Sequence, residues 1–145
     1  MPRPNRPSGK AAEALQAALD AEMTGVALYT HLAFRVFGPQ MQGIVTHLRG
    51  QAAESLQHAE AVGDRMTMIG AVPRVRNLEE LEHSPTSLDE ILRVSLVHEK
   101  RAIEAYRNVL ASSEGDIPLE EFARSMVATE TDHASALEKM LRPMG

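Results

Sequence analysis

The chain has no cysteine and no tryptophan, and aromatic residues make up only 3% of its 145 residues. The absence of cysteine excludes disulfides, thiolate metal sites and thiol catalysis. The scarcity of aromatic residues argues against a sheet protein, because strands favour aromatic and β-branched side chains. Alanine, leucine, methionine and glutamate, which are strong helix formers, are abundant instead. The composition therefore predicts an all-α fold.

Long apolar runs and a basic excess are missing too. No uninterrupted apolar run approaches the length that crosses a membrane, and no apolar signal region follows the proline-rich start MPRPNRPSGK. The formal net charge of −5 leaves no excess of basic residues to neutralise phosphates. We therefore expect a cytoplasmic protein with no membrane and no nucleic-acid partner, in which residues 1–9 form a flexible N-terminal arm.

Glycine, proline and helix-capping residues divide the rest of the chain into four long helical segments. We expect these helices over about residues 9–37, 39–68, 88–112 and 117–142. Ser8 is the expected N-cap of the first, and Ser87 with Glu90 forms a capping box at the start of the third.

The connections between these segments predict the topology. Those at Gly38-Pro39 and at residues 113–117 are short enough for antiparallel hairpins, whereas residues 71–86 can cross the length of a bundle. We expect one domain over residues 10–142, an antiparallel four-helix bundle with one long crossover.

The first and third helical segments resemble each other when residue n is laid on residue n+77. Glu22 then falls on Glu99, and Tyr29 on Tyr106. Apolar residues at helical spacing predict a stripe that faces the core: Leu15, Leu19, Val26, Leu92, Leu96 and Ile103. A glutamate within such a stripe must be paired, protonated or bound to a metal, because an unpaired buried charge is very unfavourable.

The second and fourth segments match at n+75, which lays His58 on His133. Glu130 lies three residues before His133, so the two side chains share a helix face and reach one point. Glutamates on two helices combined with histidines on the other two form the di-metal carboxylate arrangement of helix bundles. Carboxylate oxygens with imidazole nitrogens suit iron or manganese, and can also hold zinc.

With these residues the sequence resembles the bacterioferritin branch of the ferritin-like superfamily, over about residues 10–142. The likeness lies in the motifs Glu22-x6-Tyr29, Ser55-Leu-Gln-His58, Glu99 and Glu130-x-x-His133.

The resemblance implies a ferroxidase centre with two iron ions, fed by Fe(II) and by O₂ or peroxide, in iron storage or detoxification. It makes Glu22 and Glu99 terminal ligands, His58 and His133 nitrogen ligands, and Glu130 a bridge. Tyr29 would stand behind the ligands and hydrogen-bond near the carboxylates. For Tyr106, core packing and a similar role are equally open.

One departure from the family pattern concerns the metal ligands. The family expects a glutamate where this chain has Ser55, and the nearest carboxylate is Glu54, one residue earlier. Positions three and four residues before His58 straddle one helix face, so we expect Glu54 to swing in as the missing bridging ligand. The alternative is a surface Glu54, with one metal or two weakly held metals.

Two further departures concern haem and assembly. Leu56 replaces the methionine that ligates haem in bacterioferritins, so we predict no haem there. Only twelve residues (145 − 133) follow His133, too few for the fifth helix of cage-forming ferritins. A homodimer or larger homo-oligomer is therefore a safer expectation than a cage.

Two other functions compete with this one. One is a di-iron or di-manganese oxidoreductase that consumes peroxide, similar to rubrerythrin or manganese catalase. The other is a helical dimerisation module whose metal site is vestigial. The remaining histidines are expected outside the site, with His98 pointing away from it and the others at the surface or an interface: His31, His47 and His83.

Overall fold

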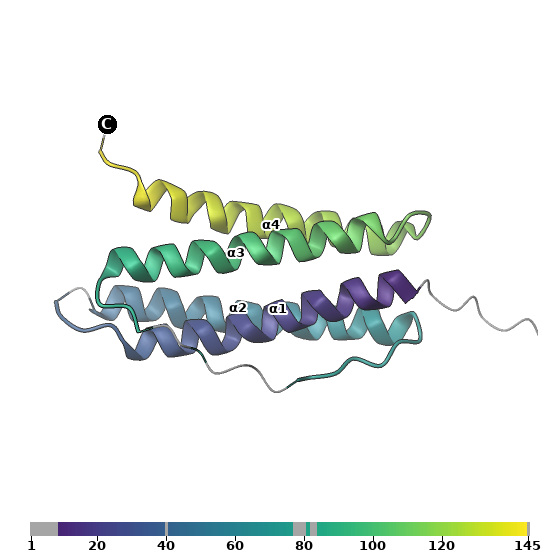
Figure 1. The fold of residues 1–145 in the computed structure, drawn as a ribbon, viewed down its shortest axis with the longest axis horizontal. Helices are drawn as coiled ribbons and strands as arrows, with labels where there is room; N and C mark the ends of the chain where they lie inside the picture. The colour runs from purple at the N-terminus through teal and green to yellow at the C-terminus, as the bar shows by residue number, and fades with distance from the viewer. Residues whose placement is uncertain (1–8, 40, 77–80, 82–83, 145) are drawn as a thin grey trace, which may run out of the picture.

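The computed structural model describes residues 9–39, 41–76, 81 and 84–144, and this part of the chain holds four helices and no strand (Figure 1). The helices are α1 (Gly9–Phe34), α2 (Met41–Met68), α3 (Leu88–Ala111) and α4 (Ile117–Leu141). α1 and α4 run in one direction, and α2 and α3 run in the other. The predicted antiparallel four-helix bundle is confirmed, while the division into an arm over residues 1–9 and a domain over 10–142 stays a prediction.

The helix ends follow from local chemistry. The Ser87 hydroxyl accepts a hydrogen bond from the Glu90 amide at 3.1 Å, and Glu90 reaches back to the Thr86 amide at 2.8 Å. Asp116 caps α4 by accepting from the amide of Leu119. The expected cap Ser8 lies outside the described residues.

The first turn departs slightly from the predicted boundaries. α1 ends three residues before Phe37, and α2 begins at Met41, two residues after Pro39. α1 ends in a tighter turn, in which the Arg35 amide donates to the Leu32 carbonyl at 3.0 Å. Gly38, four residues past the end of α1, takes a φ of 103°, a left-handed conformation that turns the chain. Its carbonyl then accepts from the Met41 amide at 3.1 Å, which closes the turn into α2.

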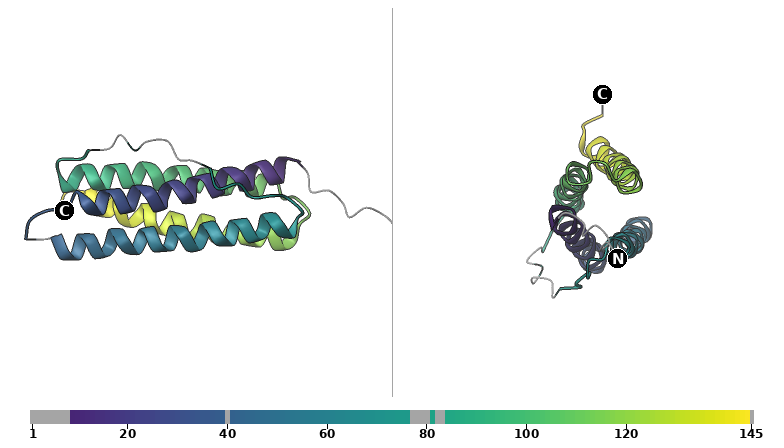
Figure 2. Two further views of the ribbon diagram at one scale, coloured as in Figure 1. Left: turned by 90° about the horizontal axis from the view of Figure 1, so that it is seen from below. Right: turned by 90° about the vertical axis from the view of Figure 1, so that its right-hand side faces the viewer.

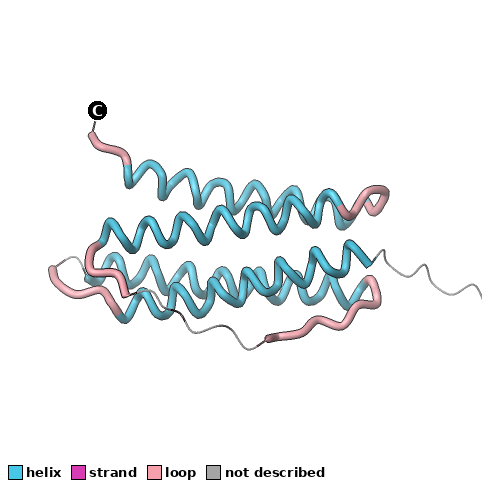
Figure 3. The backbone as a smooth tube through the Cα atoms, viewed as in Figure 1, coloured by secondary structure: helices cyan, strands magenta, loops and turns pink. Residues whose placement is uncertain are grey.

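The long connection between α2 and α3 leaves one end of the bundle and enters α3 at the other (Figures 1 and 3). Gln16 on α1 holds its described beginning in place. The side-chain amide of Gln16 donates to the carbonyl of Arg74 at 2.9 Å and accepts from the Arg74 amide at 3.0 Å. This pair of hydrogen bonds lays the start of the crossover along α1, and the predicted crossover is confirmed.

The buried apolar side chains form two clusters. The larger includes Leu15, Leu19 and Val62, and the smaller includes Leu28 and Leu48. Part of the predicted core stripe is wrong, because the following residues are only half-buried: Val26, Leu92, Leu96 and Ile103. The buried face of α3 is rotated by one position and carries Ile91, Ser95, His98, Glu99, Ala102, Tyr106 and Val109.

The helices do not all pack equally closely. The closely packed pairs are α1 with α2, α3 with α4, and α1 with α3. Seen from one end in Figure 2, the four helices trace an arc with α2 and α4 at its two ends. We call the side of the bundle between these two helices the α2–α4 side. Within the described part of the chain, no helix is both long and apolar enough to cross a membrane.

Candidate metal centre

Each of the four helices contributes a carboxylate or an imidazole to one polar group inside the bundle. Glu22 comes from α1, His58 from α2 and Glu99 from α3, while α4 provides Glu130 and His133. The three glutamates are only 2–3% exposed. Ionisable side chains this deeply buried require hydrogen bonds, opposite charges or a metal, since desolvation disfavours a lone charge.

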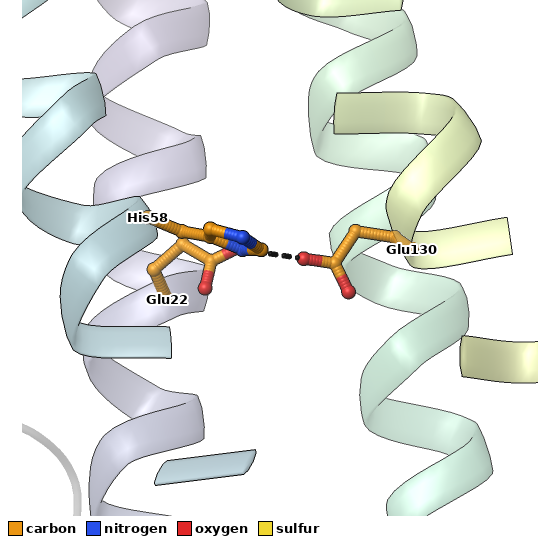
Figure 4. Close-up of side chains that lie close together, drawn as sticks. All are labelled: Glu22, His58 and Glu130. Atoms are coloured by element: carbon orange, nitrogen blue, oxygen red, sulfur yellow. Dashed lines mark hydrogen bonds and ion pairs between the residues drawn. The ribbon is translucent and has the colours of Figure 1, made fainter. Parts of the chain in front are cut away.

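These side chains form two groups that share one carboxylate. Ligand atoms of Glu22, His58 and Glu130 lie within 4.8 Å of one another, and so do those of Glu99, Glu130 and His133. Oε1 of Glu130 lies 3.0 Å from Nδ1 of His58 (Figure 4), and its Oε2 lies 3.3 Å from Nδ1 of His133. Glu130 therefore stands between two potential metal positions.

Two tyrosines hold the other two glutamates, each from the opposite helix. The Tyr29 hydroxyl on α1 donates to Oε1 of Glu99 on α3 at 2.5 Å. The Tyr106 hydroxyl on α3 donates to Oε1 of Glu22 on α1 at 3.0 Å. Burial raises the pKa of both tyrosines far above the usual range, so each hydroxyl keeps its proton for its carboxylate.

The donor set fits a hard divalent cation. Three carboxylates and two imidazoles are the ligand types that iron and manganese take from proteins. Among the described residues, Oε2 of Glu99 is a buried side-chain atom with no hydrogen-bond partner. It belongs to the group with Glu130 and His133, where a cation would satisfy it. The residues present therefore fit a metal pair.

Protons balance the charges in the metal-free protein. Burial raises the pKa of Glu22 and Glu99 to about 7. Burial alone would lower the pKa of His58, but its hydrogen bonds to Glu130 and Glu22 raise it to about 10. A hydrogen bond to Glu130 likewise raises the pKa of His133 to about 10. In the absence of metal, the two imidazolium groups thus supply the positive charge beside Glu130 that bound cations would otherwise supply.

Glu54 lies outside both groups of potential ligands. Its carboxylate is one-third exposed and lies against the outer nitrogens of the two imidazoles, 3.6 Å from Nε2 of His58 and 3.3 Å from Nε2 of His133. Ser55, the neighbouring residue on α2, is the one that turns into the bundle, where it is 8% exposed. The structure thus brings Glu54 to the site, but on the far side of the histidine rings from Glu130.

His98 is the residue near the site that sequence reasoning missed. It was expected to point away, yet it is 6% exposed, and its ring meets the Tyr29 ring edge-on with centroids 5.6 Å apart. A Cβ on Gly25 would lie 2.7 Å both from Nε2 of His98 and from Oγ of Ser55, so the three residues meet at one point. Burial lowers the pKa of His98 to about 4. Its spacing from Ser95 and Ala102 on the buried face of α3 was the available signal.

Neither His31 nor His47 belongs to the two groups of potential ligands. His47 is exposed, His31 is half-buried, and His83 lies outside the described residues. Leu56, at the position of the haem methionine, is exposed on α2.

The family of the chain follows from a comparison with family models. Residues 12–144 match the model of the ferritin-like domain. The chain therefore belongs to the ferritin-like family. No curated protein sequence gives a significant match.

Solved structures of similar fold include bacterioferritin itself. A ferritin-like diiron-carboxylate protein of Bacillus anthracis str. Ames superposes with a TM-score of 0.84 at 20% identity, over 92% of this chain and 96% of that one. The bacterioferritin of Rhodobacter capsulatus gives 0.81 at 24% identity, over 92% and 84%.

A bacterioferritin-related protein of Bacteroides fragilis, described as a dodecameric thioferritin, gives 0.79 at 23% identity, over 94% and 89%. At these identities the likeness carries the fold, and the predicted resemblance to the bacterioferritin branch is confirmed at that level.

Proposed function

We propose that this protein binds two iron ions between its helices and oxidises Fe(II) there, in iron storage or iron detoxification. The observation that carries the proposal is the pair of ligand groups joined by Glu130. Glu22 and His58 would hold one ion, Glu99 and His133 the other, and each oxygen of Glu130 faces one of the two positions. Membership of the ferritin-like family and similarity to a diiron-carboxylate protein support the assignment.

The ligand types favour oxidation of the iron. Anionic carboxylate oxygens stabilise Fe(III) more than Fe(II), because the higher charge gains more from the same three glutamates. Two Fe(II) ions losing one electron each, together with two protons, reduce O₂ to hydrogen peroxide or hydrogen peroxide to two water molecules. Tyr29 holds Oε1 of Glu99 and leaves its Oε2 3.8 Å from Nδ1 of His133. Tyr106 holds Oε1 of Glu22, the oxygen that lies 3.5 Å from Nδ1 of His58, so both carboxylates are fixed beside the histidines.

The α2–α4 side is the direction from which Fe(II) would arrive. The side chains of His58 and His133 are 14% and 22% exposed there, and that of Glu54 is 34% exposed. The glutamates behind them are buried. A cation approaching from solvent would therefore meet Glu54 and the imidazoles first.

A homo-oligomeric cytoplasmic protein is part of the same proposal. The similar protein of Bacteroides fragilis is described as dodecameric. Several large apolar side chains are exposed on the chain, as expected of surfaces that meet another copy: Phe34, Phe37, Met41, Met68, Val97 and Met140. Light scattering of the purified protein measures the assembly, and a mass of one chain would contradict this part.

Anaerobic titration with Fe(II) tests metal binding. Two equivalents should bind to the wild-type protein, and Glu130→Ala should abolish tight binding of both. Glu60→Ala, which removes an exposed carboxylate from α2, is the matched control and should bind like the wild type. Binding of less than one equivalent by the wild type, with no gain of thermal stability, would instead favour a vestigial site.

Stopped-flow absorbance after mixing the Fe(II)-loaded protein with O₂ or peroxide tests the reaction. Rapid formation of Fe(III) over repeated additions of iron is the expected result. Fast loss of peroxide without accumulation of ferric iron would contradict the ferroxidase assignment and favour the peroxide-consuming alternative.

A further inference from the structure

Glu54 and Glu130 contact the same two histidines from opposite sides. Glu130 faces the inner nitrogens, with Oε1 3.0 Å from Nδ1 of His58 and Oε2 3.3 Å from Nδ1 of His133. Glu54 faces the outer nitrogens, with Oε1 3.6 Å from Nε2 of His58 and Oε2 3.3 Å from Nε2 of His133. The four side chains thus form a closed ring in which carboxylates and imidazoles alternate.

Within this ring, Glu130 and Glu54 face different nitrogens of the histidines. The inner nitrogens, Nδ1, are the ones grouped with Glu22, Glu99 and Glu130, so they are the nitrogens available to metals. An imidazole that binds a metal through one nitrogen carries a hydrogen on the other, and that hydrogen needs an acceptor. Glu54 presents one oxygen to each of these outer nitrogens.

The position of Glu54 on α2 places its carboxylate beside the outer nitrogens and outside both groups of potential ligands. Glu54 lies four residues before His58, so the two side chains are neighbours one turn apart on α2. Ser55 occupies the inward position on that turn, and Glu54 is left at the edge of the α2–α4 side. From there its carboxylate reaches across to His133 on α4 at 3.3 Å.

We propose that Glu54 is a positioning residue that orients both imidazole ligands through their outer nitrogens, and that it does not bind the metal itself. This inference rests on the proposed metal site. Holding His58 and His133 with one carboxylate fixes both rings with Nδ1 inward. It also links α2 to α4 on the side where these two helices are not closely packed.

Metal titration of Glu54 variants tests this role. Co(II), followed by its visible absorption, serves as a spectroscopic stand-in for Fe(II) under anaerobic conditions. Glu54→Ala should still bind two equivalents, but with about ten- to hundredfold weaker affinity, the usual effect of removing a carboxylate behind a histidine ligand. Glu54→Gln should restore part of the loss, because its amide oxygen accepts from one Nε2–H only. The control Glu60→Ala should match the wild type.

Nitrogen-15 NMR of the Zn(II)-loaded protein tests the contact with the outer nitrogens directly. A carboxylate that only bound the metal would not slow the exchange of the histidine Nε2–H hydrogens with water. In the wild type, two histidine Nε2–H signals should exchange slowly with water because each is held by Glu54. Both should broaden or vanish in Glu54→Ala, while the control keeps them.

Two results would overturn the inference while leaving the proposed function in place. One is loss of a whole metal equivalent in Glu54→Ala, which would make Glu54 a ligand. The other is a Glu54→Ala variant whose affinity and Nε2–H signals equal those of the wild type. Failure of the wild-type protein to bind metal would overturn the proposed function itself, and this inference with it.

Discussion

The Tyr106 hydroxyl on α3 donates to Oε1 of Glu22 on α1 at 3.0 Å, across the interface between the two helices. Its counterpart in the sequence repeat, Tyr29, makes the same contact in the opposite direction, to Glu99. Each half of the chain therefore provides a tyrosine that hydrogen-bonds to a glutamate of the other half and orients its carboxylate. The sequence left two roles open for Tyr106, core packing and a hydrogen bond near the carboxylates. In the structure Tyr106 is buried in the core and also donates a hydrogen bond to Glu22, a potential ligand.

Tyr106→Phe should destabilise the metal-free protein by about 1–3 kcal/mol, because it leaves a buried carboxylate oxygen without its donor. Tyr29→Phe should act on Glu99 in the same way. Urea unfolding of each variant beside the wild type measures the change. Since phenylalanine retains the ring that packs in the core, an unchanged midpoint would contradict a structural role for the hydroxyl.

Replacement of single glutamates by glutamine should separate the two metal positions. Glu22→Gln should weaken the position next to His58, and Glu99→Gln the one next to His133, whereas Glu130→Gln should weaken both because Glu130 belongs to both groups. Equilibrium dialysis against Fe(II) with metal analysis measures the stoichiometry. Glu138→Gln, an exposed change on α4, is the control. Equal losses from all three variants would contradict two separate positions.

The metal-free protein should lose stability as the pH rises from about 6.5 to about 10. Glu22 and Glu99 have pKa values raised to about 7, so the stability that their protons contribute is complete below their ordinary pKa and is lost as the pH passes 7. His58 and His133 have pKa values raised to about 10, so their contribution is complete below 6.5 and is lost as the pH rises through 10.

Two other groups do not oppose this trend in that window. The pKa of Glu130 is lowered, because hydrogen bonds from both histidines outweigh its burial, so its contribution is lost only in acid. His98, with a pKa of about 4, is neutral throughout. Urea midpoints measured at intervals of pH check the trend. Metal affinity should change in the opposite sense and rise with pH, because cations displace these protons. A midpoint that rises with pH in the metal-free protein would contradict the charge balance.

Gly25→Ala should destabilise the protein, because the new methyl group would lie 2.7 Å from both Nε2 of His98 and Oγ of Ser55. Gly50→Ala is the matched control, since Gly50 also lies inside a helix but nothing approaches its Cβ position within 4 Å. The control should gain about 0.5–1 kcal/mol from helix propensity. Thermal unfolding measures the stability of both variants. An equal gain in stability for Gly25→Ala and Gly50→Ala would contradict the prediction, because it would show that His98 and Ser55 move aside without loss of stability.

The sequence alone determined the four helices and their direction, and it pointed to five residues that the structure brings together in the two groups of potential ligands. Repetition of Glu22 as Glu99, and of His58 as His133, predicts ligands on four helices because the helical period fixes which residues of one helix share a face. Glu130 follows from the same rule, being one turn before His133. For these residues no knowledge of tertiary packing was needed beyond four helices around one core.

Only the tertiary structure decided which side chains turn inward where two helices pack against each other. Glu54 and Ser55 straddle the same face of α2 in the sequence, and the rotation of α2 against α1 and α4 sends Ser55 inward and Glu54 to the outer nitrogens of the histidines. The same kind of rotation of α3 buries His98 against Gly25 and leaves Leu92 half-buried. Helix rotation depends on how side chains from different helices interlock, and that information is not contained in the period of any single helix.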